Sequence, residues 1–494
     1  MILFRYYVKI FIVTLIISFR PIPLLASSGM PSIITDIEVD SLIQDISIDI
    51  FGVAGLNTKY LDMFVISDPS INAFVYQNSV FVNTGLISFV KNSDALYGVL
   101  AHETGHMAKK HIMRMVLNAE DAINKIGGIA LLLSILSIGL APLSAGMILS
   151  ALPVFLPTVG LGMFLQNNLQ YSRSKESEAD QAAITYLKKL KKPLSGLRDI
   201  FSFFDSGTPD SAIAYKYFYT HPLPAERLDA ISIAQHEFNS IHLNPVDCKI
   251  EKRLRRARAK ILGYLDSGNY NILHRVDEPH FCFSKQEIQF FKNYKKLYSL
   301  IKNKSYDRAL SLCNGMIAEN PKDPYLLETK SSIFLETGKV QEAIKTYRVF
   351  KGMMSNRLVS YQFALVLSRS DRKEQLYEAI DQLKYLIAMD IPRSKYYYML
   401  GFIYGKLQKS CHKNLYFAES LIRSNQPKLA AQKASKAISA FRRQCKSGKM
   451  SKDERLKQQS LCYIAYDILD VSLSKMKSRK DKKLYSKYKE DPCI

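Results

Sequence analysis

Two histidines four residues apart, His102 and His106, constrain the fold of this chain more than any other feature. Residues at this spacing lie on one face of an α-helix, so both imidazoles can bind one metal ion. Glu103 can reach the open position of that metal and accept a proton from its bound water. Gly105 leaves the helix surface bare, which allows a neighbouring segment to approach closely. We therefore expect a helix from about Ser93 that presents a zinc site; two solvated histidines on an ordinary helix are the alternative.

The acidic run at residues 176–180 supplies candidates for a third ligand, because two histidines leave a zinc site one protein ligand short. Glu176 and Asp180 are four residues apart and share a helical face. Glu176 can bind zinc, and Asp180 can hold a ligand histidine in orientation. Helical geometry points Glu178 elsewhere. His111, five residues past His106, is expected to face away from the metal and to be structural.

Four segments, taken in order, resemble metallopeptidase family 48, which includes the heat-shock protease HtpX and the CAAX prenyl proteases. The run 102–106 followed by 176–180 is similar to the family's HExxH and ExxxD patterns. Residues 72–74 and 80–86 resemble its strand pair ahead of the zinc helix, and 221–227 resembles its HPxxxxR element. The resemblance implies a gluzincin-type zinc metallopeptidase domain, mainly α with a small β-sheet.

The resemblance also assigns roles to individual residues. It implies zinc as cofactor, with the ligands His102, His106 and Glu176 and the base Glu103. His221 and Arg227 would lie beside the zinc. For His221 two roles stay open: a hydrogen bond to the oxyanion of the tetrahedral intermediate, or a fourth zinc ligand that keeps the enzyme latent.

The segment from Asn72 to Val82 is rich in β-forming residues and has a turn at 77–79, where relatives often carry glycine. An edge strand near a peptidase site can bind an extended peptide through backbone hydrogen bonds. We therefore expect Asn72, Ala73 and Phe74 to bind substrate. A core hairpin without that role is the alternative.

Residues 1–28 are typical of a signal peptide. Arg5 and Lys9 precede an uncharged run from Ile10 to Phe19, and residues 26–28 are small enough for cleavage. Roughly ten apolar residues are too few to span a bilayer, which takes about 20. Whether this segment is cleaved or kept as an anchor, we expect the rest of the chain to leave the cytoplasm.

The net charge is strongly positive, since 68 Lys and Arg face 45 Asp and Glu, which gives +23. Such an excess allows anionic partners, although lysine-rich solvated faces explain it equally well. In an exported protein the charge would face membranes or other proteins, so we expect no nucleic acid partner.

Residues 126–172 contain no charged side chain, and glycines and prolines divide them into short apolar pieces. We expect this insert to form amphipathic or membrane-touching helices near the zinc. A spanning hairpin and a buried core are the alternatives.

The C-terminal half repeats with a period of 34 residues, as Ala309 and Ala343 show in matching contexts. This is the tetratricopeptide period, and stacked helix pairs of that kind form a concave surface that binds protein segments. A plain helical bundle is the alternative. The seven cysteines all lie from Cys248 onward, and their pairing is not determined by the sequence.

The expected domains are a zinc metallopeptidase domain at 29–245, a connector at 246–285, an α-solenoid of tetratricopeptide repeats at 286–440 and a basic helical tail at 441–494. With these repeats, the chain most resembles the periplasmic beta-barrel assembly-enhancing branch of the family. That resemblance implies work in the periplasm of a Gram-negative-type cell, on outer-membrane barrel proteins and with the barrel assembly machinery. The alternative is a chaperone or adaptor with a latent peptidase.

Overall fold

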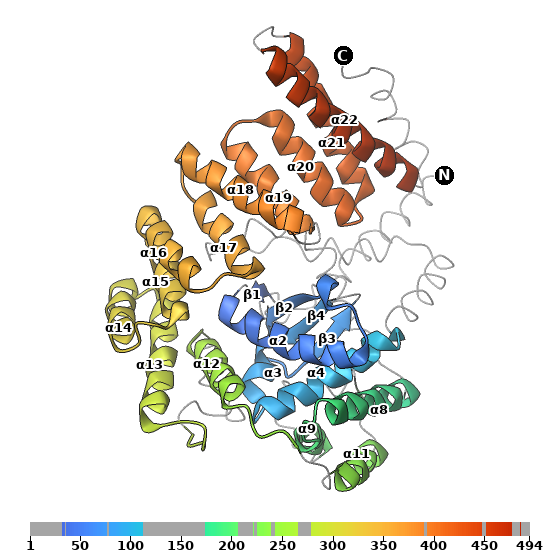
Figure 1. The fold of residues 1–494 in the computed structure, drawn as a ribbon, viewed down its shortest axis with the longest axis vertical. Helices are drawn as coiled ribbons and strands as arrows, with labels where there is room; N and C mark the ends of the chain where they lie inside the picture. Colours follow the sequence, from blue (N-terminus) through green and yellow to red (C-terminus); the bar gives the residue numbers. More distant parts are fainter. Residues whose placement is uncertain are drawn as a thin grey trace, which may run out of the picture.

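The computed structural model describes residues 32–34, 36–76, 79–111, 173–205, 221, 225–238, 243–264, 278–389, 393–446, 451–476 and 485. Three predicted features lie outside these residues, namely the signal peptide, the uncharged insert at 126–172 and the centre of the turn at 77–78. The described part is mainly α-helical with one small β-sheet, as predicted (Figure 1).

The sheet has four strands in the order β1-β2-β4-β3. Their bounds are β1 Ser32–Ile34, β2 Asp62–Ser67, β3 Ala73–Tyr76 and β4 Ser79–Asn83. β4 runs parallel to β2 and antiparallel to β3. Phe81 of β4 stacks between Phe64 and Phe74, with ring centroids 5.0 and 4.5 Å apart. Such cross-strand aromatic pairs stabilise the register.

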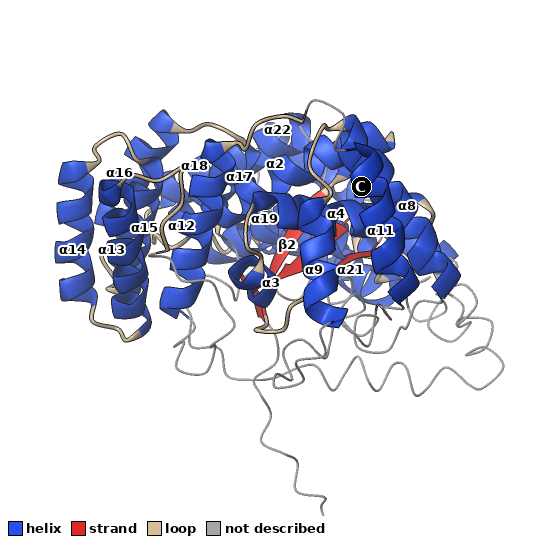
Figure 2. Cartoon of the chain, turned by 90° about the horizontal axis from the view of Figure 1, so that it is seen from below, coloured by secondary structure: helices blue, strands red, loops and turns tan. Residues whose placement is uncertain are grey.

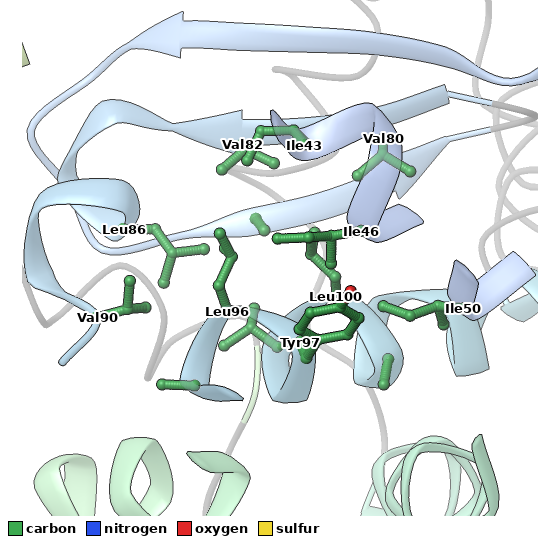
Figure 3. Close-up of a cluster of buried hydrophobic side chains, with 14 of the residues drawn as sticks. Ile43, Ile46, Ile50, Val80, Val82, Leu86, Val90, Leu96, Tyr97 and Leu100 are labelled. Atoms are coloured by element: carbon green, nitrogen blue, oxygen red, sulfur yellow. The ribbon is translucent and has the colours of Figure 1, made fainter. Parts of the chain in front are cut away.

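Helices pack on this sheet and enclose it, as Figure 2 shows with the strands in red. Their bounds are α2 Ile37–Ala54, α3 Thr84–Phe89, α4 Ser93–Ala108, α8 Arg173–Lys189, α9 Ser195–Asp205 and α11 Ala225–Phe238, with a 3-10 turn η1 at Thr58–Tyr60. α2 and α4 meet the sheet in an apolar core that includes Ile46, Val80 and Leu100 (Figure 3).

α4, which carries the paired histidines, is the central helix of this half. It packs against α2, α8, α9 and β3, and every residue from Ser93 to His106 is buried. A Cβ at Gly105 would lie 2.8 Å from the carbonyl oxygen of Ala179 in α8. Only glycine fits so close an approach, which confirms the prediction made for this position.

The remaining helices form a stack in which each helix packs mainly against the next. They are α12 Cys248–Tyr264, α13 Lys285–Lys302, α14 Tyr306–Glu319, α15 Pro324–Glu336, α16 Val340–Met353, α17 Arg357–Ser368, α18 Lys373–Met389, α19 Ser394–Lys406, α20 Ser410–Arg423, α21 Pro427–Lys446 and α22 Lys452–Lys475. The stack curves from one side of the sheet domain to above it (Figure 1).

The 34-residue spacing has a structural counterpart in this stack. Ala309 and Ala343 are each the fourth residue of their helices, α14 and α16, and both are completely buried. Equivalent positions therefore make equivalent packing contacts, as a solenoid of repeated helix pairs requires. The assignment of these pairs to the tetratricopeptide class stays a prediction.

One of the expected domain limits differs from the element boundaries. The limit at 440 falls inside α21, and α22 packs on α21 through the apolar cluster that includes Ala437 and Leu469. The expected connector contains α12, whose Leu254 joins the core of the sheet domain and whose Leu262 joins the first core of the stack. α12 is therefore shared between both halves.

A buried ionic cluster joins α2 to the stack. Glu38 of α2 pairs with Arg256 and with Lys260 of α12, the latter at 3.0 Å, and accepts a hydrogen bond of 2.7 Å from Tyr294. Arg256 also pairs with Asp323, just before α15. The basic run of α12 thus neutralises acidic groups inside the protein.

A disulfide between Cys248 and Cys282 links the start of α12 to the segment before α13.

Among the described helices, none combines the length and the apolar character needed to cross a membrane.

Candidate metal centre

Four buried side chains converge beside the sheet. His102 and His106 come from α4, Glu176 from the first turn of α8, and His221 from the segment before α11. One ligand atom of each lies within 4.8 Å of all the others. The structure therefore brings together the three predicted ligands and the histidine whose role was left open.

The separations between these atoms test whether a metal fits. Nε2 of His102 lies 3.1 Å from Nε2 of His106 and 3.4 Å from the Glu176 carboxylate. Nε2 of His106 is 3.3 Å from that carboxylate, and Nδ1 of His221 is 3.0 Å from it. Tetrahedral zinc with N and O ligands at about 2.0–2.1 Å separates its ligand atoms by about 3.3–3.4 Å. The donor set and its spacing fit a zinc ion.

Asp180 orients the first histidine. Its Oδ1 is 2.9 Å from Nδ1 of His102, so the imidazole proton is held on Nδ1 and the Nε2 lone pair faces the cluster. This is the contact expected for Asp180 from its spacing after Glu176.

Arg227 lies behind the cluster and binds its carboxylates. It pairs with Asp180 through two hydrogen bonds and with Glu176 through Nη1 at 2.8 Å. Its guanidinium also lies over the ring of Phe201, 4.7 Å from the centroid. Arg227 thus holds both carboxylates in place, a role that its sequence motif alone did not specify.

The charge balance keeps Glu176 ionised. Burial works against the charged form, but the neighbouring imidazoles of His221, His102 and His106 hold the pKa of Glu176 well below its usual range. An ionised carboxylate is the form that binds a metal ion.

Glu103 is the predicted base, and it is completely buried next to the cluster. Burial raises the pKa of its carboxyl group. Neither carboxylate oxygen has a hydrogen-bond partner within the described part of the chain, and Oε1 lies 3.5 Å from Nε2 of His221. A buried carboxylate without partners is costly, and it is suited to receive a proton from a water at the metal.

His221 presents its two nitrogens in different directions. Nδ1 lies 3.5 Å from Nε2 of His102, within the ligand cluster, whereas Nε2 is directed toward Glu103. Nδ1 is therefore the nitrogen of His221 that lies among the candidate ligand atoms. Residues 222–224, which follow it, lie outside the described chain.

His111 does not face away from the site, contrary to the expectation from helical periodicity. α4 ends at Ala108, and Lys110 adopts a left-handed backbone with φ 56°. The chain turns there and returns His111 to the cluster, where its Nδ1 lies 3.0 Å from Nδ1 of His106. Its Nε2 contacts Glu178, 3.3 Å away. The missed signal was the end of the helix before residue 111.

The predicted substrate strand, β3, is the last strand in the described order of the sheet. β3 pairs with β4 on one side and packs against α4. The side chains of Asn72, Ala73 and Phe74 are buried, so they point into the protein. A peptide could therefore contact this strand through its outer backbone edge, and the structure gives these three side chains a packing role.

Residues 37–234 match the sequence profile of peptidase family M48. The beta-barrel assembly-enhancing protease of Escherichia coli strain K12 is 22% identical over 307 residues, which cover 61% of this chain and 59% of that protein. The protein of the same name from Yersinia pestis is 23% identical over 57% of this chain and 55% of its own length. Metalloprotease YcaL of E. coli is 31% identical over 36% of this chain and 63% of its own length.

The alignments span a little more than half of the two assembly-enhancing proteases, 59% and 55% of their lengths. The profile match at residues 37–234 covers the part of the chain that contains the metal cluster. It supports the resemblance drawn from the motifs of that domain.

Proposed function

We propose that this chain is an exported zinc-dependent endopeptidase, because residues 37–234 match peptidase family M48. One observation carries the proposal: the ligand cluster of His102, His106 and Glu176 lies beside a buried Glu103 whose carboxylate has no hydrogen-bond partner in the described part of the chain. A structural zinc site would have no use for such a carboxylate.

The residues divide the chemistry as follows. Zinc held by these ligands would lower the pKa of a bound water toward about 7 and polarise the peptide carbonyl. Glu103 is placed to accept a proton from the attacking water, whose oxygen would bond to the carbonyl carbon. It then passes the proton to the amide nitrogen as the carbon–nitrogen bond breaks. Asp180 and Arg227 keep His102 and Glu176 aligned throughout.

His221 regulates access in this proposal. With its Nδ1 at the fourth position of the cluster, it occupies the place that the attacking water needs. The described arrangement is then a latent form, and His221 must leave before cleavage. This favours the blocking role over the oxyanion role.

We place the enzyme in outer-membrane protein quality control, where it would degrade misassembled barrel proteins and assist the assembly of others. The names of the related proteins of E. coli and Y. pestis, beta-barrel assembly-enhancing protease, support this assignment. The signal-like N-terminus and the Cys248–Cys282 disulfide support a periplasmic location, because disulfides persist in oxidising compartments. The helical stack would dock on the barrel assembly machinery, and the insert at 126–172 would contact the membrane.

A latent-peptidase chaperone or adaptor is the second candidate. The observation that favours it is His221 at the fourth metal position, since a permanently blocked site would leave only the binding surface of the stack.

The test compares the full chain with Glu103→Gln. Both should contain about one zinc per chain by elemental analysis, while casein cleavage by the variant should fall about 10²–10⁴-fold. Exposed Glu226→Gln, at the second residue of α11, serves as the control and should cleave normally. Cleavage by Glu103→Gln at the wild-type rate would reject the enzyme. Barrel assembly in cells that needs the chain but not Glu103 would favour the chaperone.

A further inference from the structure

We infer that His111 and Glu178 form a relay that orients the imidazole of His106 toward the metal. This positioning role rests on the proposed zinc site and extends it. The two residues come from different parts of the chain: His111 follows the end of α4, and Glu178 lies on the second turn of α8.

The proton on His106 defines the first link. Its Nε2 lies among the ligand atoms, 3.1 Å from Nε2 of His102. A nitrogen that binds a metal must offer its lone pair, so the proton of the neutral ring is on Nδ1. That Nδ1 is 3.0 Å from Nδ1 of His111. His106 is therefore the donor, and His111 is the acceptor.

The second link follows from the first. When Nδ1 of His111 accepts, its own ring proton is on Nε2. Nε2 of His111 is 3.3 Å from Oε2 of Glu178, and the carboxylate accepts a hydrogen bond from this N–H. The donors thus run in one direction, from His106 through His111 to Glu178. The side chain of His111 is 1% exposed and that of Glu178 is 51% exposed, so the relay ends at the surface.

The two metal-binding histidines of α4 are therefore oriented by different means. Nδ1 of His102 lies 2.9 Å from the buried carboxylate of Asp180. His106 donates to a neutral imidazole, and the carboxylate lies one residue further away. Replacing His111 would remove this acceptor from Nδ1 of His106. The ring would then be freer to rotate or to carry its proton on Nε2, where it cannot bind metal.

The backbone around His111 is built for this contact. Lys110, which precedes it, is in the left-handed region, uncommon for a residue with a side chain. Its N–H donates to the carbonyl of Met107 at 3.0 Å. The rings of His106 and His111 then meet edge to face, with their centroids 5.2 Å apart and their planes at 70°.

The test measures zinc affinity of the full-length chain by competition with a chelator. His111→Phe keeps a ring but removes the acceptor, and it should weaken zinc binding about 10–100-fold, the usual effect of losing such a partner. His111→Gln keeps an acceptor oxygen and should recover most of that loss. His236→Phe, an exposed histidine on α11, is the matched control and should bind zinc normally.

A second readout separates positioning from packing. The absorption bands of bound Co²⁺ report ligand geometry, and they should shift in His111→Phe but not in His236→Phe. Glu178→Ala should weaken zinc binding by a smaller factor, about two- to fivefold, because this carboxylate is half exposed. Glu178→Gln, which keeps an acceptor, should lie between Glu178→Ala and the wild type.

The outcomes decide clearly. Wild-type zinc affinity in folded His111→Phe overturns the relay. If His111→Phe does not fold, Glu178→Ala decides, and an unchanged affinity and Co²⁺ spectrum overturn the relay. A wild-type chain that binds no zinc overturns the proposed function as well, so the two failures are distinguishable.

Discussion

The guanidinium of Arg227 grips the carboxylate of Asp180 with two hydrogen bonds, Nε to Oδ2 at 2.6 Å and Nη2 to Oδ1 at 2.8 Å. Both side chains are almost completely buried, and the same Asp180 oxygen that accepts from Nη2 faces Nδ1 of His102. The pair therefore connects α11 to the histidine helix. Its geometry requires the planar fork of arginine, which lysine lacks.

We predict that Arg227→Met destabilises the protein by about 3–5 kcal/mol, because it leaves Asp180 and Glu176 as buried charges without their cation. Arg227→Lys should recover only part of this. Urea unfolding of the metal-free chain measures the change.

The matched control is Arg198→Met. Arg198 forms an exposed pair with Asp199 and should change the free energy of unfolding by about 1 kcal/mol or less. Equal stabilities of Arg227→Met and the wild type would contradict the structural role of the pair.

Glu176→Ala should lose most of its bound zinc. The substitution removes one of the three predicted ligands, and it leaves His102 and His106 as the pair on α4. Zinc content after dialysis against buffer checks this, with exposed Glu226→Ala as the control. Equal zinc contents would place the third ligand elsewhere.

His221→Ala should retain zinc and raise basal cleavage, including self-cleavage. If the uncovered form is populated at about 1–10%, removing the block should increase the rate about 10–100-fold. The measurement is casein cleavage at equal zinc content. Slower cleavage would instead assign His221 to the oxyanion, and an unchanged rate would exclude both roles.

Glu328 should make stability depend on pH. Burial raises the pKa of this α15 carboxyl to about 8, with Asp36 and Glu38 adding to the shift and Lys260 opposing it. Its folded pKa exceeds its ordinary value of 4.5, so the folded state binds the proton more tightly than the unfolded one. Stability from this group is complete below about pH 4.5 and is lost as the pH rises toward 8.

We therefore expect Glu328→Gln to be more stable than the wild type at pH 8, by on the order of 1 kcal/mol or more, and to differ less at pH 5. Thermal unfolding at both values measures this, with exposed Glu319→Gln on α14 as the control. A stability difference that is the same at pH 5 and pH 8 would show that Glu328 does not hold a proton in the fold.

Much of the site was predictable because its signals are local. His102 and His106 share a helical face through i, i+4 geometry, and so do Glu176 and Asp180. Glycine at position 105 indicated that a neighbouring segment approaches the histidine helix closely, and in the structure that segment is α8. The 34-residue period likewise predicted stacked helices, since each repeat carries its own packing pattern.

Contacts that depend on chain direction could not be predicted in this way. Periodicity places His111 on the far side of α4 only if the helix continues. The left-handed Lys110 ends it and reverses the chain. Helical geometry directs Glu178 away from the candidate metal ligands, and it gives no sign that His111 lies beside this carboxylate.

The sequence by itself determined which side chains could bind a metal, since helical spacing sets their common face whatever surrounds the helix. Only the tertiary structure decided how those side chains are held. It brought Arg227 to two carboxylates, His221 to the ligand cluster and His111 to His106. Each of these contacts joins residues whose separation along the chain sets no distance in space, so the packing of α4, α8 and α11 had to place them.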